Sequence, residues 1–143
     1  MELVSVRKIG PGLHDVDDWQ LLLALHRDAR PWDGLITCDA QMLSQAREMV
    51  ALQQTQLTLV VTESGSNPVR AVGTLLCHLT HICSVTTPDR AQVWRVKVSQ
   101  KHPDTAQSFL ERIAERQGES VANIWAANKL TNAQLLNGPG DDE

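Results

Sequence analysis

The sequence predicts an α/β protein built on a mostly parallel sheet of about four strands. Short apolar or β-branched segments alternate with longer segments whose apolar residues recur every three or four positions, as in successive strand–helix units. The run at residues 57–62 is apolar on both faces, which is typical of a strand buried within a parallel sheet. Together these patterns favour an alternating strand–helix fold.

The elements follow one another along the chain. Strands are expected at residues 2–6, 35–38, 57–62 and 92–98. Helices are expected from Asp18 to before Pro31, over 42–50, from Asn67 to Cys83, and from a cap at Asp104 or Thr105 through Ile113. The strand at 92–98 alternates apolar and polar residues, which predicts a strand with one wet face or a strand at the edge of the sheet. The third helix carries an apolar stripe formed by Val69, Val72, Leu76, Leu79 and Cys83.

Length and composition bound the organisation of the chain. Its 143 residues, 42% of them apolar, suffice for the core of one modest domain, which we place at residues 1–118. Beyond Gly118 the signal fades, so residues 119–143 are predicted to form a C-terminal extension with at most a short helix. The stretch 137–143 has the composition of a frayed, partly disordered tail.

Charge and cysteine content narrow the function classes. A formal net charge of −4 gives no broad basic field, so RNA binding requires a local patch or metal ions. The second half of the chain offers such basic residues, although interleaved acids also fit an ordinary solvated face: Arg90, Arg95, Lys97, Lys101, Arg112 and Arg116. Three scattered cysteines favour a reducing cytoplasm, and neither a membrane span nor an export signal is predicted.

Two acidic stretches are the candidate site. Asp15, Asp17 and Asp18 precede the first long helix, and Asp39 closes the strand at 35–38. Loops at one edge of such a sheet converge, so these carboxylates are predicted to bind Mg²⁺ or Mn²⁺. The alternative is that they only cap helix N-termini. Glu63, after the strand at 57–62, is a weaker candidate ligand.

The string Asp17-Asp18-Trp19-Gln20-Leu21-Leu22-Leu23-Ala24-Leu25, followed by Leu35-Ile36-Thr37-Cys38-Asp39, resembles the PIN-like domain family. In that family an acid heads a helix and an apolar strand ends in Thr-x-Asp. The resemblance covers about residues 1–63 and implies a three-layer α/β/α fold with helices on both faces of the sheet. It also implies a metal-dependent ribonuclease of the kind found in bacterial toxin–antitoxin pairs, with Asp18 and Asp39 as catalytic metal ligands and Asp15 or Asp17 assisting.

The chain departs from the family pattern at two places. The family opens with a strand that ends in an essential Asp, and no such unit precedes Met1-Glu2-Leu3. The family's further acid after Thr-x-Asp is replaced here by Ala40-Gln41-Met42-Leu43. We therefore expect an N-terminally reduced version with part of the metal site. The alternatives are a catalytically inactive module that binds an antitoxin-like protein or a second copy, and, more weakly, a small-ligand-binding domain.

Overall fold

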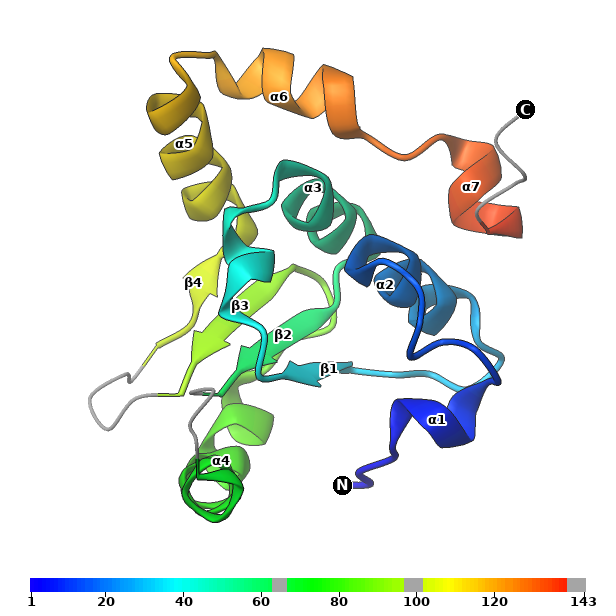
Figure 1. Cartoon of the computed structure of the whole chain (residues 1–143), viewed down its shortest axis with the longest axis vertical. Coiled ribbons are helices and arrows are strands. Elements are labelled where there is room, and N and C mark those ends of the chain that lie inside the picture. The colour runs from blue at the N-terminus through cyan, green and yellow to red at the C-terminus, as the bar shows by residue number, and fades with distance from the viewer. Residues whose placement is uncertain (63–66, 97–101, 139–143) are drawn as a thin grey trace.

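The protein folds around one mixed sheet, seen here in a computed structural model that describes residues 1–62, 67–96 and 102–138 (Figure 1). Within these ranges the strands are β1 (Gly34–Thr37), β2 (Thr58–Val61), β3 (Gln92–Arg95) and β4 (Asp104–Thr105). They lie in the order β1-β2-β3-β4. The first three are parallel, and β4 runs antiparallel to β3. The predicted α/β class with a mostly parallel sheet is confirmed.

Helices precede, connect and follow the strands. In the described part of the chain they are α1 (Val6–Ile9), α2 (Asp18–Arg27), the 3-10 helix η1 (Ala40–Ser44), α3 (Ala46–Thr55), α4 (Pro68–Val85), α5 (Ala106–Gln117), α6 (Val121–Asn128) and α7 (Asn132–Asn137). The helices predicted after Asp18, Asp39, Asn67 and Thr105 are therefore present. Two of the predicted caps are also observed, since the side chains of Asn67 and Thr105 accept hydrogen bonds from the first turns of α4 and α5.

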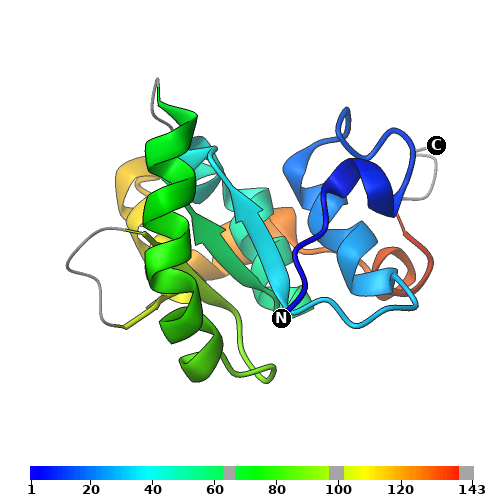
Figure 2. The ribbon, with the colours of Figure 1, turned by 90° about the horizontal axis from the view of Figure 1, so that it is seen from below.

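The two connecting helices α3 and α4 lie on opposite faces of the sheet (Figures 1 and 2). Successive strand residues point to opposite faces. Leu59 and its neighbours on β1 and β3 accordingly pack in the large apolar cluster with α2, α3 and α5. Val60 and Trp94 pack in a smaller cluster with Ile82 of α4. β2 is buried along its whole length, as predicted for residues 57–62.

The two parallel crossovers have opposite hands. β1 connects to β2 through α3, and β2 connects to β3 through α4, so both steps cross the sheet in the same direction. Because the two helices lie on opposite faces, one of the connections must be left-handed (Figure 2). Right-handed crossovers are strongly preferred, so this connection is an unusual feature of the fold.

The C-terminal helices pack onto the same core as the rest of the chain. Ile124 of α6 and Leu130, between α6 and α7, belong to the large apolar cluster. Gln54 of α3 fixes this segment, because its side-chain amide donates to the carbonyl oxygen of Leu130 at 3.0 Å and accepts from the Leu130 amide at 2.7 Å. Residues 119–138, predicted as an extension, thus cover α3 and α2 (Figure 1). The tail at 139–143 lies outside the described residues.

The predicted strand at residues 2–6 is wrong. Residues 1–5 form no regular element, and Val6 begins the short helix α1. The physical reason is that Val6 and Ile9, spaced as neighbours on one helix face, both pack against the large apolar cluster. The fourth strand of the sheet is instead β4, whose residues the sequence predicted only as a helix cap.

The prediction of a wet face for the strand at 92–98 is also wrong within the part described. Gln92, Val93 and Trp94 are all buried, because β2 and β4 flank β3 and α4 covers one of its faces. Residues 97 and 98 lie outside the described ranges. Of the polar positions described, Gln92 is shielded by neighbouring elements, and Arg95 is partly exposed but pairs with Asp104.

The apolar stripe of α4 is only partly buried. Leu79 and Ile82 are its buried residues, and the His81 ring packs edge-on against Trp94 with centroids 5.7 Å apart. Three predicted stripe residues are instead exposed, namely Val69 at 81%, Val72 at 54% and Leu76 at 57%. α4 lies on the outside of the molecule (Figure 2), and these exposed residues give it an apolar surface. Every helix in the described ranges falls short of the length and apolarity that a membrane crossing requires.

Candidate functional site

Asp17 and Asp18 form the start of α2. Asp17 is the extended N-cap residue, and its backbone amide donates to Oε1 of Gln20 at 3.1 Å. Asp18 is the first helical residue and is half-buried. Trp19, the next residue, is buried in the large apolar cluster and anchors this end of the helix. The carboxylates thus stand at the positive end of the α2 dipole, as the capping alternative predicts.

Asp39 ends the β1 segment and begins η1. Its Oδ1 accepts a hydrogen bond from the Gln41 amide at 2.8 Å, and its own amide donates to Oγ1 of Thr37 at 3.0 Å. These two bonds fix the turn that follows the strand. Asp39 is exposed, so its second carboxylate oxygen lies in reach of solvent and ligands.

Asp15 is placed differently from the other predicted ligands. Its carboxylate contacts Nε2 of its neighbour His14 at 3.0 Å, and its side chain is 77% exposed. The contact is local in sequence and lies in the turn that precedes α2. Asp15 therefore contributes to the surface of this turn.

The structure places Asp18 and Asp39 within electrostatic reach of each other. Burial is the main cause that raises the pKa of Asp18 above its ordinary value, and the negative charge of Asp39 raises it further. Asp17 adds a smaller effect in the same direction. Two acids separated by twenty residues in the chain thus lie in one region, and their mutual repulsion favours uptake of a proton or a cation there.

Glu48 is a third carboxylate of this region, which the sequence analysis missed. It lies in the first turn of α3 and is only 8% exposed. Burial raises the pKa of Glu48, with further increases from the charges of Asp18 and then Asp17. Glu48 is therefore the most buried acid of the group, whereas Asp18 is half-buried and Asp17 is exposed.

Gln45 and Arg47 both act on Glu48, the first through hydrogen bonds and the second through its charge. With its amide turned so that the nitrogen faces Glu48, Gln45 donates to the two carboxylate oxygens at 3.1 and 3.3 Å. Arg47 opposes the rise in the pKa of Glu48 through its positive charge, and its guanidinium lies 3.9 Å from the centre of the Trp19 ring. A cation–π contact thus joins α3 to α2 at the level of the acids.

The acids are gathered more loosely than a complete metal centre requires. Over residues 1–62, 67–96 and 102–138, no three His, Cys, Asp or Glu side chains are placed to hold one metal ion together. A Mg²⁺ ion bound through one or two carboxylates keeps waters and takes substrate phosphate oxygens as further ligands. Asp18 and Asp39 fit that kind of partial site. Glu63, the further candidate, lies outside the described residues.

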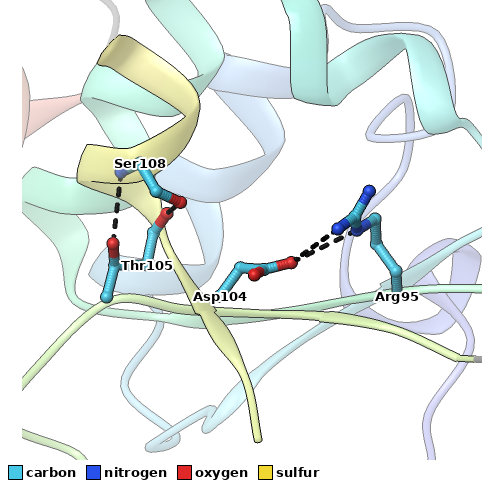
Figure 3. Close-up of polar contacts among 4 residues, drawn as sticks. All are labelled: Arg95, Asp104, Thr105 and Ser108. Atoms are coloured by element: carbon cyan, nitrogen blue, oxygen red, sulfur yellow. Dashed lines mark hydrogen bonds and ion pairs between the residues drawn. The ribbon is translucent and has the colours of Figure 1, made fainter. Parts of the chain in front are cut away.

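The predicted basic face is largely engaged within the protein. Arg95 donates from Nε and Nη2 to Oδ2 of Asp104 at 3.2 and 3.0 Å, which joins β3 to β4 beside the Thr105 cap of α5 (Figure 3). Arg90 pairs with Asp89, Arg112 lies over Phe109, and Arg116 donates to the Ser44 carbonyl. Lys97 and Lys101 lie outside the described residues. These contacts favour the alternative of an ordinary solvated face over an RNA-binding patch.

The sequence carried little signal for Glu48. The helix predicted over residues 42–50 has its apolar stripe on the side of Met49 and Val50, which puts Glu48 on the face expected to meet water. In the structure α3 is enclosed by α2, α5 and α6, so residues on several of its sides are buried. The one signal in the sequence was that Glu48 stands near the start of a helix that begins shortly after Asp39.

Comparisons with known proteins give no family for this arrangement. No protein-family model, no curated protein and no solved structure matches the chain.

Proposed function

We propose that the chain is a PIN-like, metal-dependent ribonuclease with a three-layer α/β/α architecture. The observation that carries this proposal is the electrostatic coupling of Asp18 and Asp39. These are the two residues that match the acids of the PIN-like pattern, and they lie at the start of a helix and the end of a strand. The same resemblance supports an RNA substrate and a role as the toxin of a toxin–antitoxin pair. Free Cys38, Cys77 and Cys83 support a cytoplasmic location.

In this proposal Asp18 and Asp39 hold Mg²⁺ or Mn²⁺, with Asp17 at the rim. A bound divalent ion lowers the pKa of a coordinated water and neutralises charge on a phosphodiester. The protein supplies orientation: the Gln41 amide fixes one oxygen of Asp39, and α2 fixes Asp18. When ionised, Glu48 would add a further negative charge near Asp18, which favours a divalent cation over a monovalent one.

The activity test is Mn²⁺-dependent degradation of an unstructured single-stranded RNA. Asp39→Asn should lower the rate by at least about tenfold, equivalent to about 1.4 kcal/mol of transition-state stabilisation. Asp33→Asn is the matched control, because Asp33 is an exposed acid at the other end of the same strand. Equal rates for wild type and Asp39→Asn would remove Asp39 from any catalytic role.

Metal binding is tested separately by thermal unfolding with added Mn²⁺. An ion that binds only the folded state stabilises it by about 2.7 kcal/mol at a hundredfold excess over Kd. The wild type should show a rise in Tm that Asp18→Asn and Asp39→Asn reduce. A rise that both variants keep in full would place the ion elsewhere.

The second candidate function is a catalytically inactive PIN-like module that acts by binding another protein. The observation that favours it is the exposed apolar surface of α4, with Val69, Val72 and Leu76 more than half exposed. This function is distinguished by three results taken together. The protein shows no Mn²⁺-dependent RNA cleavage and no Mn²⁺-induced rise in Tm, and it still forms a stoichiometric complex with another protein through α4.

A further inference from the structure

A positively charged side chain stands beside the acids at the junction of α2 and α3. Arg47 is the second residue of α3 and directly precedes Glu48. Its guanidinium carbon lies 3.9 Å from the centre of the Trp19 ring, and Trp19 directly follows Asp18 at the start of α2. The two helices pack side by side (Figure 1). Both helices therefore place Arg47 next to the acids of the candidate site.

The charge of Arg47 is not neutralised by an ion pair. In the part of the chain that the structure describes, every ion pair involves other residues than Arg47. The carboxylate of Glu48, its neighbour, accepts hydrogen bonds from Gln45. Arg90 and Arg95, by contrast, each pair with an aspartate. The guanidinium of Arg47 is therefore available to an anion that comes from outside the chain.

The contact with Trp19 fixes the plane of this guanidinium. Trp19 is only 6% exposed, so its ring offers a rigid surface for stacking. Arg47 is half-buried, and its Nε is buried without a hydrogen-bond partner within the described residues. The terminal Nη groups are thus the polar atoms that remain to meet a ligand. A planar fork held in this way loses little conformational freedom when it binds the oxygens of a phosphate.

We propose that Arg47 binds a backbone phosphate of the RNA strand, next to the phosphate that is cleaved at Asp18 and Asp39. This inference rests on the proposed function. A divalent ion held by two carboxylates takes oxygens of the cleaved phosphate as further ligands, whereas the neighbouring phosphate needs a cation from the protein. Arg47 supplies that cation. Phosphate contacts position a strand without reading its bases, so the effect of Arg47 is the same for RNAs of different sequence.

The test measures binding of a fluorescein-labelled single-stranded RNA of about 12 nucleotides to the full chain by fluorescence anisotropy. Ca²⁺ replaces Mn²⁺ to occupy the carboxylates, and the salt concentration is varied. Arg47→Met should raise Kd at least about fivefold and reduce the slope of log affinity against log salt by about 0.7, the share of one phosphate on a single strand. Arg47→Lys keeps the charge, so it should restore the slope but bind more weakly than wild type.

Arg90→Met is the matched control, because Arg90 lies before β3, at the opposite edge of the sheet from Asp39. It removes the same charge and should leave Kd and slope unchanged. Circular dichroism verifies that each variant is folded, and a loss of folded protein alone would lower the affinity without changing the slope.

Three outcomes separate this contact from the nuclease activity. Equal Kd and slope for wild type and Arg47→Met would overturn the role of Arg47, even in a chain that cleaves RNA with Mn²⁺. A wild type that binds no RNA up to about 100 µM would overturn it as well. Weaker binding and a lower slope for Arg47→Met, in a chain without Mn²⁺-dependent cleavage, would support the phosphate contact and count against the proposed function.

Discussion

Gly34 of β1 lies so close to Thr58 of β2 that a side chain at position 34 would collide with the Thr58 carbonyl. The two residues face each other in the parallel register of the strands that lead to Asp39 and to Thr62. Glycine at position 34 therefore permits the close approach of the strand ends.

Replacing Gly34 by Ala should destabilise the protein by about 1–3 kcal/mol, because the added methyl group forces the two strands apart. Urea unfolding measures the change. Gly73→Ala is the matched control, since Gly73 lies within α4 with open space around it. That control should gain about 0.5–1 kcal/mol from helix propensity. Losses of equal size in both variants would contradict the steric explanation.

The stability of the wild type should fall as the pH rises through the raised pKa of Glu48. Because the folded pKa lies above the ordinary value of 4.5, folding favours the protonated acid. Its stabilising contribution is complete below that value and is lost above the folded pKa. Asp18 acts in the same direction from its ordinary value of 3.8.

Glu48→Gln removes this loss while it preserves the shape of the side chain. The variant should become progressively more stable relative to wild type as the pH is raised from about 4 to 7. Urea unfolding at several pH values gives the comparison, with Glu115→Gln at an exposed position of α5 as the control. A difference that stays constant over this interval would show that Glu48 ionises as easily in the folded chain as in the unfolded one.

Arg47 should stabilise the junction of α2 and α3 by about 0.5–2 kcal/mol through its contact with Trp19. Arg47→Met keeps much of the apolar stem but removes the cation, so it should lower the free energy of unfolding by this amount and strengthen the pH dependence caused by Glu48. Arg47→Lys restores the charge without the planar stacking. If Arg47→Lys and Arg47→Met lower the free energy of unfolding by the same amount at pH 7, the charge of Arg47 does not contribute to stability.

The Arg95–Asp104 pair should contribute about 0.5–1 kcal/mol, because it is partly exposed but uses two donors on one carboxylate oxygen. A double-mutant cycle with Arg95→Ala and Asp104→Ala isolates this coupling. The coupling should decrease at high salt. Strictly additive losses in the cycle would mean that the pair positions β4 without stabilising it.

Local patterns in the sequence predicted much of the fold. The β-branched run that became β2 and the Asn67-Pro68 start of α4 are specified by neighbouring residues, so they were predicted correctly. The local sequence pattern at residues 2–6 also favours a strand, but no strand of the described structure lies beside this segment to pair with it. Packing of Val6 and Ile9 on the apolar cluster decides its conformation instead.

The candidate site was predictable only in part. Asp18 and Asp39 each occupy an element terminus, which local sequence reveals, and the topology of the sheet brings those termini together. The burial of Glu48 depends on how α2 and α5 enclose α3, which no periodicity in residues 46–55 encodes. The exposure of the α4 stripe is equally a tertiary property, because an amphipathic pattern does not state how much of its apolar face the fold will cover.

Because α4 buries few of its residues, we expect it to detach from the sheet at a lower free energy than the rest of the molecule unfolds. α4 is attached to the small cluster through Ile82 and the partly buried Leu75, whereas α3 lies within the large one. Its amide protons should therefore exchange with solvent through an opening of lower free energy than global unfolding, while those of α3 exchange only when the whole chain unfolds. An opening of this kind would detach one crossover of the sheet and leave the region of Asp18, Asp39 and Glu48 folded.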